Sequence, residues 1–209
     1  MNQSQFQQAA GISAGLAARW YPHITAAMKE FGITASVDQA MFIAQCGHES
    51  TGFTQLVESF NYSVGGLEYF VKVKRLTQDQ ANMLGRKFYE KSLPIERQRA
   101  IANLVYSKRF GNKTAGDGWK YRGRGIIGIT FLDNYMKCGT ALKLDLVSNP
   151  ELLEKDINAA RSAAWFYVSG GCLKYPGDLV RVTKIINGGS NGIDNRSTRF
   201  LKAKSVLAG

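Results

Sequence analysis

The chain has 209 residues, and its 27 lysines and arginines against 16 aspartates and glutamates give a formal net charge of +11. Hydrophobic residues make up 44% and aromatic residues 11%, which excludes an acidic disordered chain and fits a single packed domain of one or two lobes. No run approaches the roughly 20 apolar residues of a membrane-spanning helix. The positive charge predicts an anionic partner, such as nucleic acid, a membrane surface or a cell-wall polymer.

Helical patterns begin at the N-terminus. The first 18 residues carry no Lys or Arg, so Met1–Ala18 is expected to form a first helix and not a secretory signal. Apolar residues spaced i, i+3, i+4 and i+7 then predict a helix that ends at Gly32. These residues are Ile24, Ala27, Met28 and Phe31. A capping box at Ser36–Gln39 is expected to open the next helix, which ends at Gly52.

The middle of the chain mixes helices with one glycine-rich segment. A capping box at Thr77–Gln80 and a proline at position 94 each predict the start of a helix. Trp119–Thr130 contains three glycines among aromatic and β-branched residues, which is typical of a loop or short strand. Thr130 is expected to cap a helix over residues 131–142, which would hold its hydroxyl in a fixed place.

The C-terminal part is helical again. Asn149–Pro150 is expected to open a long helix that runs to Val168 and stops at Gly170–Gly171. Further helices are expected over residues 178–187 and 194–207. The predicted fold class is therefore mainly α.

Three cysteines stand at positions 46, 138 and 172, an odd number with no metal-ligand spacing. Such cysteines are typical of small buried hydrophobic residues in a reducing compartment. We therefore expect free, buried thiols and synthesis in a cytoplasm.

Two glutamates form the first candidate site: Glu49 at a predicted helix end and Glu58 across a predicted loop. An inverting glycosidase needs one protonated carboxyl for the leaving oxygen and one ionised carboxylate to activate water. Apolar neighbours such as Phe53 favour Glu49 as the acid, since desolvation disfavours a carboxylate. Polar Ser59 and Asn61 favour Glu58 as the base. From spacing alone, a pair of unrelated surface carboxylates is the alternative.

The dipeptide His48-Glu49 could also begin a zinc-binding motif. The HExxH motif needs a second histidine at position 52, where this chain has Gly52. A zinc protease is therefore excluded, and a local hydrogen bond is the simpler role for His48. We expect no metal.

The segment from Tyr121 to Thr130 is the second cluster. Its glycines allow a ligand to approach the backbone closely, while Tyr121, Arg122 and Arg124 supply donors and a stacking face. A phosphate loop would need the lysine of GxxxxGK, which is absent here. A third cluster runs from Asn187 to Arg196, where both residues could face a cleft or simply flank a glycine turn between two helices.

Taken together, these clusters resemble glycoside hydrolase family 19, the plant-chitinase type, and above all phage endolysins of that fold. His48-Glu49-Ser50 is similar to the family's acid motif, and Glu58–Ser63 is similar to the short-spaced motif that carries the base in phage members. The remaining matches are Tyr121–Gly125 with Thr130 and Asn134-Tyr135, and Asn187–Gly189 with Arg196. The match spans roughly residues 37–199.

The resemblance implies a lysozyme-like helical fold with a large and a small lobe around a substrate cleft. It implies one catalytic domain over residues 1–209, with the small lobe at about 69–110. In this reading Glu49 is the general acid, Glu58 the general base, and Thr130 orients the attacking water. The expected substrate-binding residues are Tyr121, Arg124, Asn134, Asn187 and Arg196.

Two positions depart from the family pattern. Gly128 stands where the family has a glutamine, which removes a sugar-contacting amide. Asn191 stands where plant chitinases carry a further glutamate, as it does in phage-like members.

The function predicted from these features is that of an inverting endolysin, a monomer without cofactors, which hydrolyses the β-1,4 glycan strands of bacterial peptidoglycan and lyses the host cell. It would be made in the host cytoplasm and reach the wall through a separately encoded membrane pore, with an anionic outer membrane as a second possible partner. A lytic transglycosylase and a chitinase are the alternatives. A nucleic-acid-binding module is disfavoured because the basic residues are dispersed and no recognition motif is present.

Overall fold

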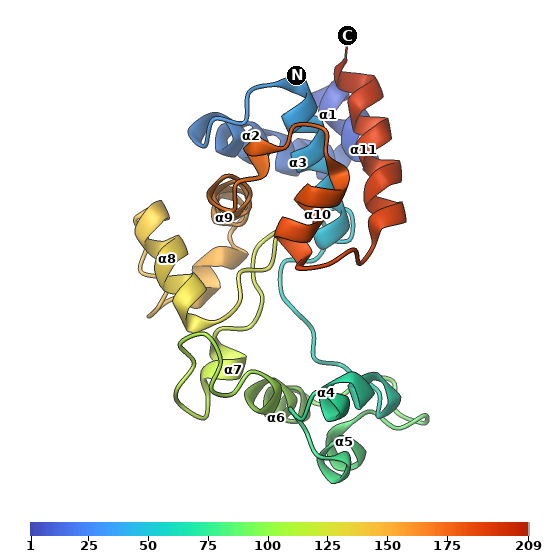
Figure 1. Ribbon diagram of the computed structural model, residues 1–209, viewed down its shortest axis with the longest axis vertical. Helices are drawn as coiled ribbons and strands as arrows, with labels where there is room; N and C mark the ends of the chain where they lie inside the picture. Colours follow the sequence, from blue (N-terminus) through green and yellow to red (C-terminus); the bar gives the residue numbers. More distant parts are fainter. Residues whose placement is uncertain (209) are drawn as a thin grey trace.

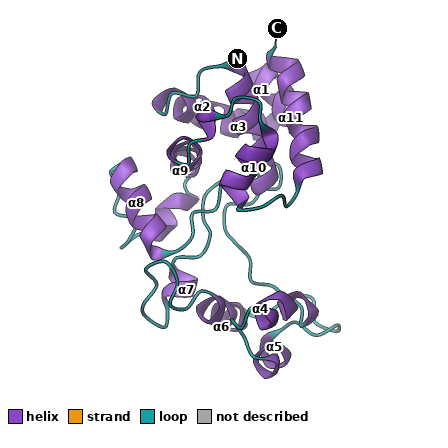
Figure 2. Ribbon diagram, in the orientation of Figure 1, coloured by secondary structure: helices purple, strands orange, loops and turns teal. Residues whose placement is uncertain are grey.

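The structure is a computed structural model that describes residues 1–208. It consists mostly of helices joined by loops (Figure 2), and no β-strand occurs in this range, where pairing is limited to isolated bridges such as Val57 with Arg124. The predicted mainly α class is therefore confirmed. Figure 1 shows two groups of helices, one containing both chain ends and a smaller one at the opposite end of the molecule.

The larger group, here called the large lobe, is built around one apolar core. Its helices are α1 (Gln3–Ala10), α2 (Ala14–Glu30), α3 (Ser36–Glu49), α9 (Asp156–Ser169), α10 (Leu179–Asn187) and α11 (Ile193–Leu207), with a short 3₁₀ turn η3 (Cys172–Lys174). Helix α3 packs against α11, and α2 packs against α9. The core includes Trp20, Phe42 and Tyr167, each fully buried.

The smaller group, the small lobe, contains its own core. Its elements are η1 (Gly65–Leu67), α4 (Glu68–Lys72), α5 (Gln78–Leu84) and α6 (Ile95–Val105). Its buried apolar residues run from Phe60 to Val105, and Trp119 packs against them from outside that range. The predicted capping box at Thr77–Gln80 is confirmed, because each side chain bonds the other residue's backbone amide.

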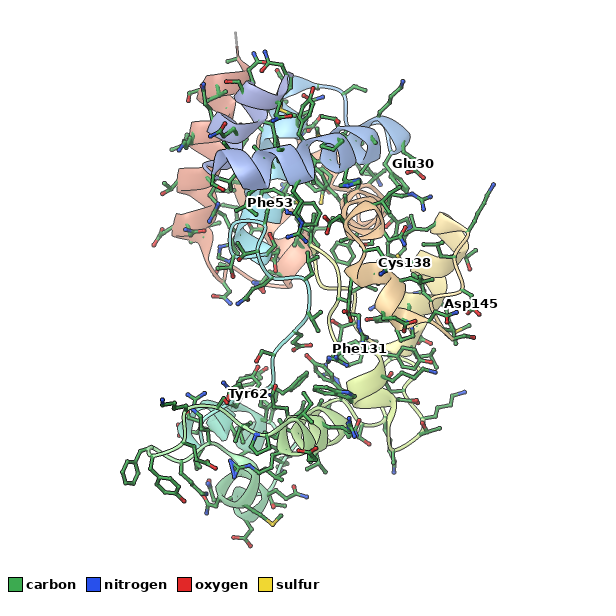
Figure 3. The ribbon with its side chains drawn as sticks, turned by 180° about the vertical axis from the view of Figure 1, so that it is seen from behind. Glu30, Phe53, Tyr62, Phe131, Cys138 and Asp145 are labelled. Atoms are coloured by element: carbon green, nitrogen blue, oxygen red, sulfur yellow. The ribbon has the colours of Figure 1, made fainter. Side chains whose placement is uncertain are left out.

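A third group of elements connects the lobes. It comprises α7 (Asp117–Lys120), α8 (Leu132–Leu142) and the 3₁₀ helix η2 (Pro150–Glu154). Its core contains Tyr121, Tyr135 and Leu153, among others. In Figure 3, Phe131 lies in this connecting region, between Phe53 in the large lobe and Tyr62 in the small lobe. The Phe131 ring packs against Tyr106 at 4.8 Å, and Phe166 of α9 packs against the core of the connecting region, so packed side chains join the lobes.

Several predicted helix boundaries were wrong for local reasons. The first helix is interrupted at Gly11, which has φ +65°, and Ser13 caps a new helix. The Ser36–Gln39 box is absent: Ala35 is the N-cap residue, and the Gln39 amide donates to the Ile33 carbonyl. The long helix expected from Pro150 is two elements, since Lys155 has an extended backbone (ψ 132°).

Two further boundaries concern the predicted site. Helix α3 ends at Glu49 instead of continuing to Gly52. Thr130 does not cap α8, whose N-cap residue is Phe131 with φ +73° and no side-chain bond. The free, buried state expected for the cysteines is confirmed. Within residues 1–208, no helix is both long and apolar enough to cross a membrane.

Candidate active site

A cleft of about 430 Å³ brings both predicted catalytic glutamates to one place. Glu49 reaches it from the end of α3, and Glu58 from the segment that leads to the small lobe. Helices α9 and α10 contribute Phe166 and Ile186. The remaining lining residues are Gln55, Leu56, Val57, Ser59, Gly123, Gly125, Ile127, Gly128 and Thr130.

Glu49 forms an ion pair with Arg196 of α11. The Arg196 Nη2 atom lies 2.5 Å from Glu49 Oε1, and the glutamate side chain keeps 25% of its surface exposed while the arginine keeps 2%. Because Oε1 is held by the guanidinium, Oε2 is the oxygen left to act on a substrate. This pairing corrects the expected apolar setting: Phe53 is buried in the core against Trp20 and does not line the cleft.

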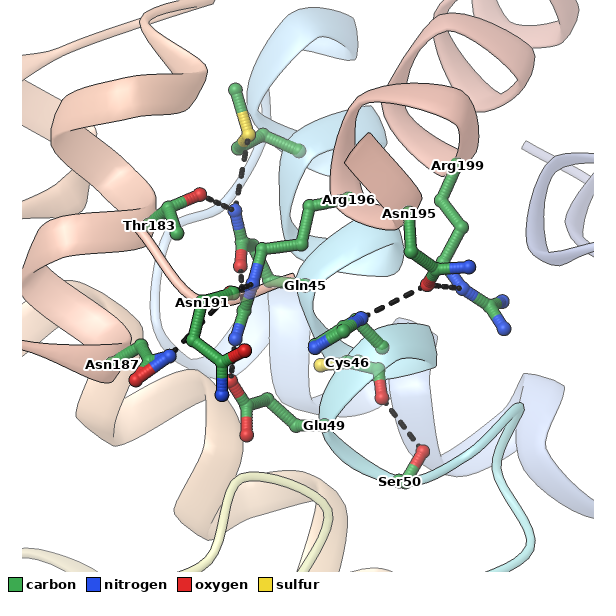
Figure 4. A network of polar contacts seen from close by, with 12 residues as sticks. Gln45, Cys46, Glu49, Ser50, Thr183, Asn187, Asn191, Asn195, Arg196 and Arg199 are labelled. Atoms are coloured by element: carbon green, nitrogen blue, oxygen red, sulfur yellow. Dashed lines mark hydrogen bonds and ion pairs between the residues drawn. The ribbon is translucent and has the colours of Figure 1, made fainter. Parts of the chain in front are cut away.

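Arg196 is itself fixed on several sides (Figure 4). Its Nη1 atom donates to Gln45 Oε1 and its Nε atom donates to the Asn191 carbonyl, at 3.0 Å for the latter. Gln45 in turn donates to the Thr183 hydroxyl at 3.1 Å. A buried arginine with three acceptors has little freedom to move, so the network sets the direction of the Glu49 carboxylate.

Glu58 is held on the other side of the cleft by two donors, one for each of its oxygens. The Tyr106 hydroxyl donates to Oε1 at 2.7 Å, and the Gly123 amide donates to Oε2 at 2.9 Å. The Glu58 amide also donates to the Gly123 carbonyl. Both ends of the residue are therefore tied to the same loop.

Burial raises the pKa of Glu58, while the bonds from Tyr106 and Gly123 and the nearby Arg122 guanidinium oppose that rise without cancelling it. Burial, together with the Glu58 carboxylate, raises the pKa of Tyr106, so Tyr106 stays a proton donor. Glu58 has polar partners as predicted, but they are not the neighbouring Ser59 and Asn61. They are Tyr106 and Gly123, which are distant in sequence.

Gly123 separates Glu58 from Thr130. A Cβ atom placed on Gly123 would lie 3.2 Å from Glu58 Oε2 and 3.3 Å from Thr130 Oγ1, closer than most real contacts. Glycine at this position therefore lets carboxylate and hydroxyl face the same small volume. Thr130 lines the cleft as predicted, and its hydroxyl donates to the Gly128 carbonyl at 3.3 Å.

Two predicted sugar-binding residues lie behind the cleft wall. Tyr121 is 3% exposed and donates to the Val147 carbonyl, while Arg124 is 5% exposed and pairs with Glu154. Arg124 also donates to the Tyr135 hydroxyl. Buried side chains with these internal partners support the loop, so the predicted direct contact with a sugar is corrected for both.

Of the three other predicted sugar contacts, Arg196 is buried and bonds Glu49, so a direct contact with a sugar is corrected for it as well. Asn134 and Asn187 differ from each other. Asn134 is half-buried and donates to the Thr130 carbonyl at 2.8 Å, which steadies the Thr130 backbone. Asn187 is exposed at the end of α10, and its amide lies 3.5 Å from the Asn191 carbonyl. The structure thus places Asn134 as a support, while Asn187 is not among the residues that line the cleft.

His48 does not line the cleft. Its Nδ1 atom is 2.9 Å from Asn195 Oδ1, and its ring packs so closely on Gly192 that a Cβ there would overlap it. This hydrogen bond reaches α11 and is not the local one expected. In residues 1–208, no group of three or more His, Cys, Asp or Glu side chains is arranged to bind a metal.

Sequence reasoning missed Gln45 and Tyr106, and it treated Arg122 as a ligand donor without finding its contact with Trp119. Gln45 stands four residues before Glu49, so helical spacing placed both on one face and could have indicated a shared partner. Tyr106 lies 48 residues from Glu58, and no local pattern connects them. Arg122 stacks 3.7 Å from the Trp119 ring centroid, a contact that depends on the folding of the loop.

Replacing Tyr106 tests whether its hydrogen bond to Glu58 sets the pH dependence of activity. Tyr106→Phe removes a hydrogen bond that lowers the Glu58 pKa, so that pKa should rise further. If Glu58 must be ionised to act, the acid limb of the pH–rate profile should move to higher pH. Tyr62→Phe is the matched control, because Tyr62 is not one of the two donors to Glu58. An unchanged limb, or one moved to lower pH, would contradict this coupling.

A helical fold with two glutamates facing one cleft is the arrangement of a glycoside hydrolase. The family model described as Chitinase class I matches residues 89–178. A Haemophilus influenzae protein named glycosyl hydrolase family 19 domain-containing protein is 38% identical over 178 residues, which is 84% of this chain and 83% of that protein. The chain belongs to glycosyl hydrolase family 19.

Other similarities are shorter or more distant. Chitinase 11 of rice (Oryza sativa subsp. japonica) is 48% identical over 50 residues, 23% of this chain and 20% of that one. Chitinase C from Streptomyces griseus superimposes with a TM-score of 0.57 at 19% identity, over 99% of this chain and 76% of that chain. A bacterial family 19 chitinase gives a TM-score of 0.51 at 21% identity, over 99% of this chain and 94% of that chain. The predicted lysozyme-like fold is confirmed.

Proposed function

We propose that this glycoside hydrolase cleaves the β-1,4 glycan strands of bacterial peptidoglycan with inversion, as a phage endolysin does in lysing its host. The observation that carries hydrolysis is the pair of glutamates facing one cleft, each held by different partners. As further parts of this proposal, the enzyme acts as a monomer and reaches the wall from the host cytoplasm through a membrane pore.

The proposed reaction assigns one role to each glutamate. Glu49, protonated on Oε2, gives its proton to the glycosidic oxygen, and Arg196 stabilises the carboxylate that remains. Glu58 takes a proton from a water molecule, for which its raised pKa makes it a stronger base while Tyr106 and Gly123 keep it oriented. The Thr130 hydroxyl holds that water beside Glu58. The hydroxyl of the water adds to the anomeric carbon as the leaving oxygen departs.

The choice of substrate rests on charge and on one substitution. A net charge of +11 favours an anionic polymer over neutral chitin. Gly128 is exposed in the cleft, where the resemblance implies a sugar-contacting glutamine. Chitin is the second candidate, because proteins named chitinases share the family and the fold.

Analysis of products by mass spectrometry tests the proposal. Purified peptidoglycan digested by the wild type should yield fragments with reducing ends that have gained one water. The same digestion with Glu58→Gln should yield none. Dehydrated anhydro-sugar ends would show a lytic transglycosylase instead, and efficient cleavage of chitin oligomers with intact peptidoglycan would show a chitinase.

A further inference from the structure

A loop at the outer end of the small lobe exposes two aromatic rings. The segment of residues 86–91, here called the Phe88 loop, lies between α5 and α6. Phe88 is fully exposed and Tyr89 is 72% exposed, and their rings meet edge to face at 5.3 Å. None of these six residues lines the catalytic cleft. Figure 1 shows α4 and α5 at the end of the molecule opposite the chain termini.

The small lobe exposes other large apolar side chains besides these two rings. More than half of the large hydrophobic side chains that are exposed in the described chain belong to the small lobe. Besides the two rings, these include Tyr69, Val73, Met83 and Ile95. Exposed apolar residues gathered on one part of a soluble protein mark an interaction site more often than a random surface does.

The charge around the Phe88 loop is positive. Arg86, Lys87 and Lys91 flank the rings in sequence. Lys91 is exposed, whereas the half-buried Arg86 and Lys87 add positive charge while donating to backbone carbonyls of the small lobe. The single acid of the loop, Glu90, is used internally. The Glu90 carboxylate accepts from the Lys87 amide and pairs with Arg97, both at 2.7 Å, and keeps 22% of its surface exposed. Over residues 69–110 there are ten lysines and arginines against three acids.

The Glu90 contacts also fix the shape of the loop. With its carboxylate bonded to the loop's own backbone and to Arg97 of α6, the loop holds its rings outward without needing a partner. A preformed loop loses less conformational entropy on binding than a flexible loop does.

We propose that the Phe88 loop binds the surface of an anionic lipid bilayer. Aromatic side chains favour the interface between headgroups and acyl chains, and lysines and arginines beside them attract anionic lipids. A fully exposed phenylalanine has no polar tip to bond sugar hydroxyls, and the loop lies outside the cleft that holds the glutamates. These features favour a bilayer over a glycan strand.

Sedimentation of the full-length protein with vesicles tests this. Binding should occur with vesicles rich in phosphatidylglycerol and be much weaker with pure phosphatidylcholine. Replacing both rings, Phe88→Ser with Tyr89→Ser, should weaken partitioning by about tenfold, the scale of burying one large side chain. Leu201→Ser is the matched control, because Leu201 is 62% exposed on α11 of the large lobe. Lys91→Glu should weaken binding most at low salt.

Hydrolysis of purified peptidoglycan separates this inference from the proposed function. The double variant should digest peptidoglycan at the wild-type rate while it loses vesicle binding. Three results would overturn the inference: unchanged vesicle binding by the double variant, loss of peptidoglycan digestion, which would make the loop a glycan site, or a dimer in size-exclusion chromatography that the double variant abolishes.

Discussion

Glu49→Gln is expected to lower the rate of peptidoglycan hydrolysis by about 10²- to 10⁴-fold, the usual contribution of a general acid. Glutamine matches glutamate in shape, and its carbonyl oxygen can still accept from Arg196, so the site should keep its geometry. Its amide cannot supply the proton that the leaving oxygen needs. Because the Glu49 side chain is 25% exposed, the substitution should change the free energy of unfolding only modestly.

The measurement is the initial rate of clearing of a purified peptidoglycan suspension, with urea unfolding of each variant in parallel. Glu151→Gln is the matched control, since Glu151 is an exposed glutamate outside the cleft. An active, folded Glu49→Gln variant would show that the proton comes from another group. Loss of activity with loss of folding would be distinguished by the unfolding curve.

The candidate site could be predicted from sequence where its parts are local. Glu49 ends a helix whose periodicity was readable, and Glu58 follows within nine residues. Thr130 follows a glycine-rich segment. Glycines can be read directly from the local sequence, and they indicate that the backbone can approach a ligand closely. In the same way, the capping box at Thr77–Gln80 depends on four adjacent residues and was predicted correctly.

The surroundings of each glutamate could not be predicted in this way. Neighbours along the chain suggested an apolar Glu49 and a polar Glu58, yet the turn after α3 sends Phe53 into the core, where it contacts Trp20. The ionic partner of Glu49 comes from α11, 147 residues away. Electrostatic environment is set by tertiary packing, so nearest neighbours in sequence are a poor guide to pKa.

The side-chain contacts predicted for the glycine-rich loop of residues 121–130 were wrong for a related reason. Its arginine and tyrosine are residue types that bind sugars, but the bridges of Arg124 with Val57 and with Ile129 fold the loop so that both side chains turn inward. The loop lines the cleft, but the two side chains predicted to face a ligand are buried. The backbone of Gly123, and not a side chain, makes the key contact with Glu58.

Arg196 is the residue whose loss should affect both folding and catalysis. It is 1% exposed and donates to Gln45, Glu49 and the Asn191 carbonyl. Arg196→Ala leaves these acceptors without their donor and opens a cavity, so it should lower the free energy of unfolding by about 2–4 kcal/mol, reduced from the cost of a fully buried pair because Glu49 is partly exposed.

Arg196→Lys separates the two effects. A lysine keeps the positive charge and part of the packing, so the free energy of unfolding should fall by only about 1–2 kcal/mol. One ammonium group on a flexible stem cannot reach three fixed acceptors at once, so the Glu49 carboxylate should lose its orientation and kcat should fall by more than about tenfold. Arg199→Lys is the matched control, because Arg199 lies one turn further along α11 and bonds Asn195. If Arg196→Lys kept the wild-type kcat, charge alone would suffice at this position, and the network behind Glu49 would serve stability without orienting the acid.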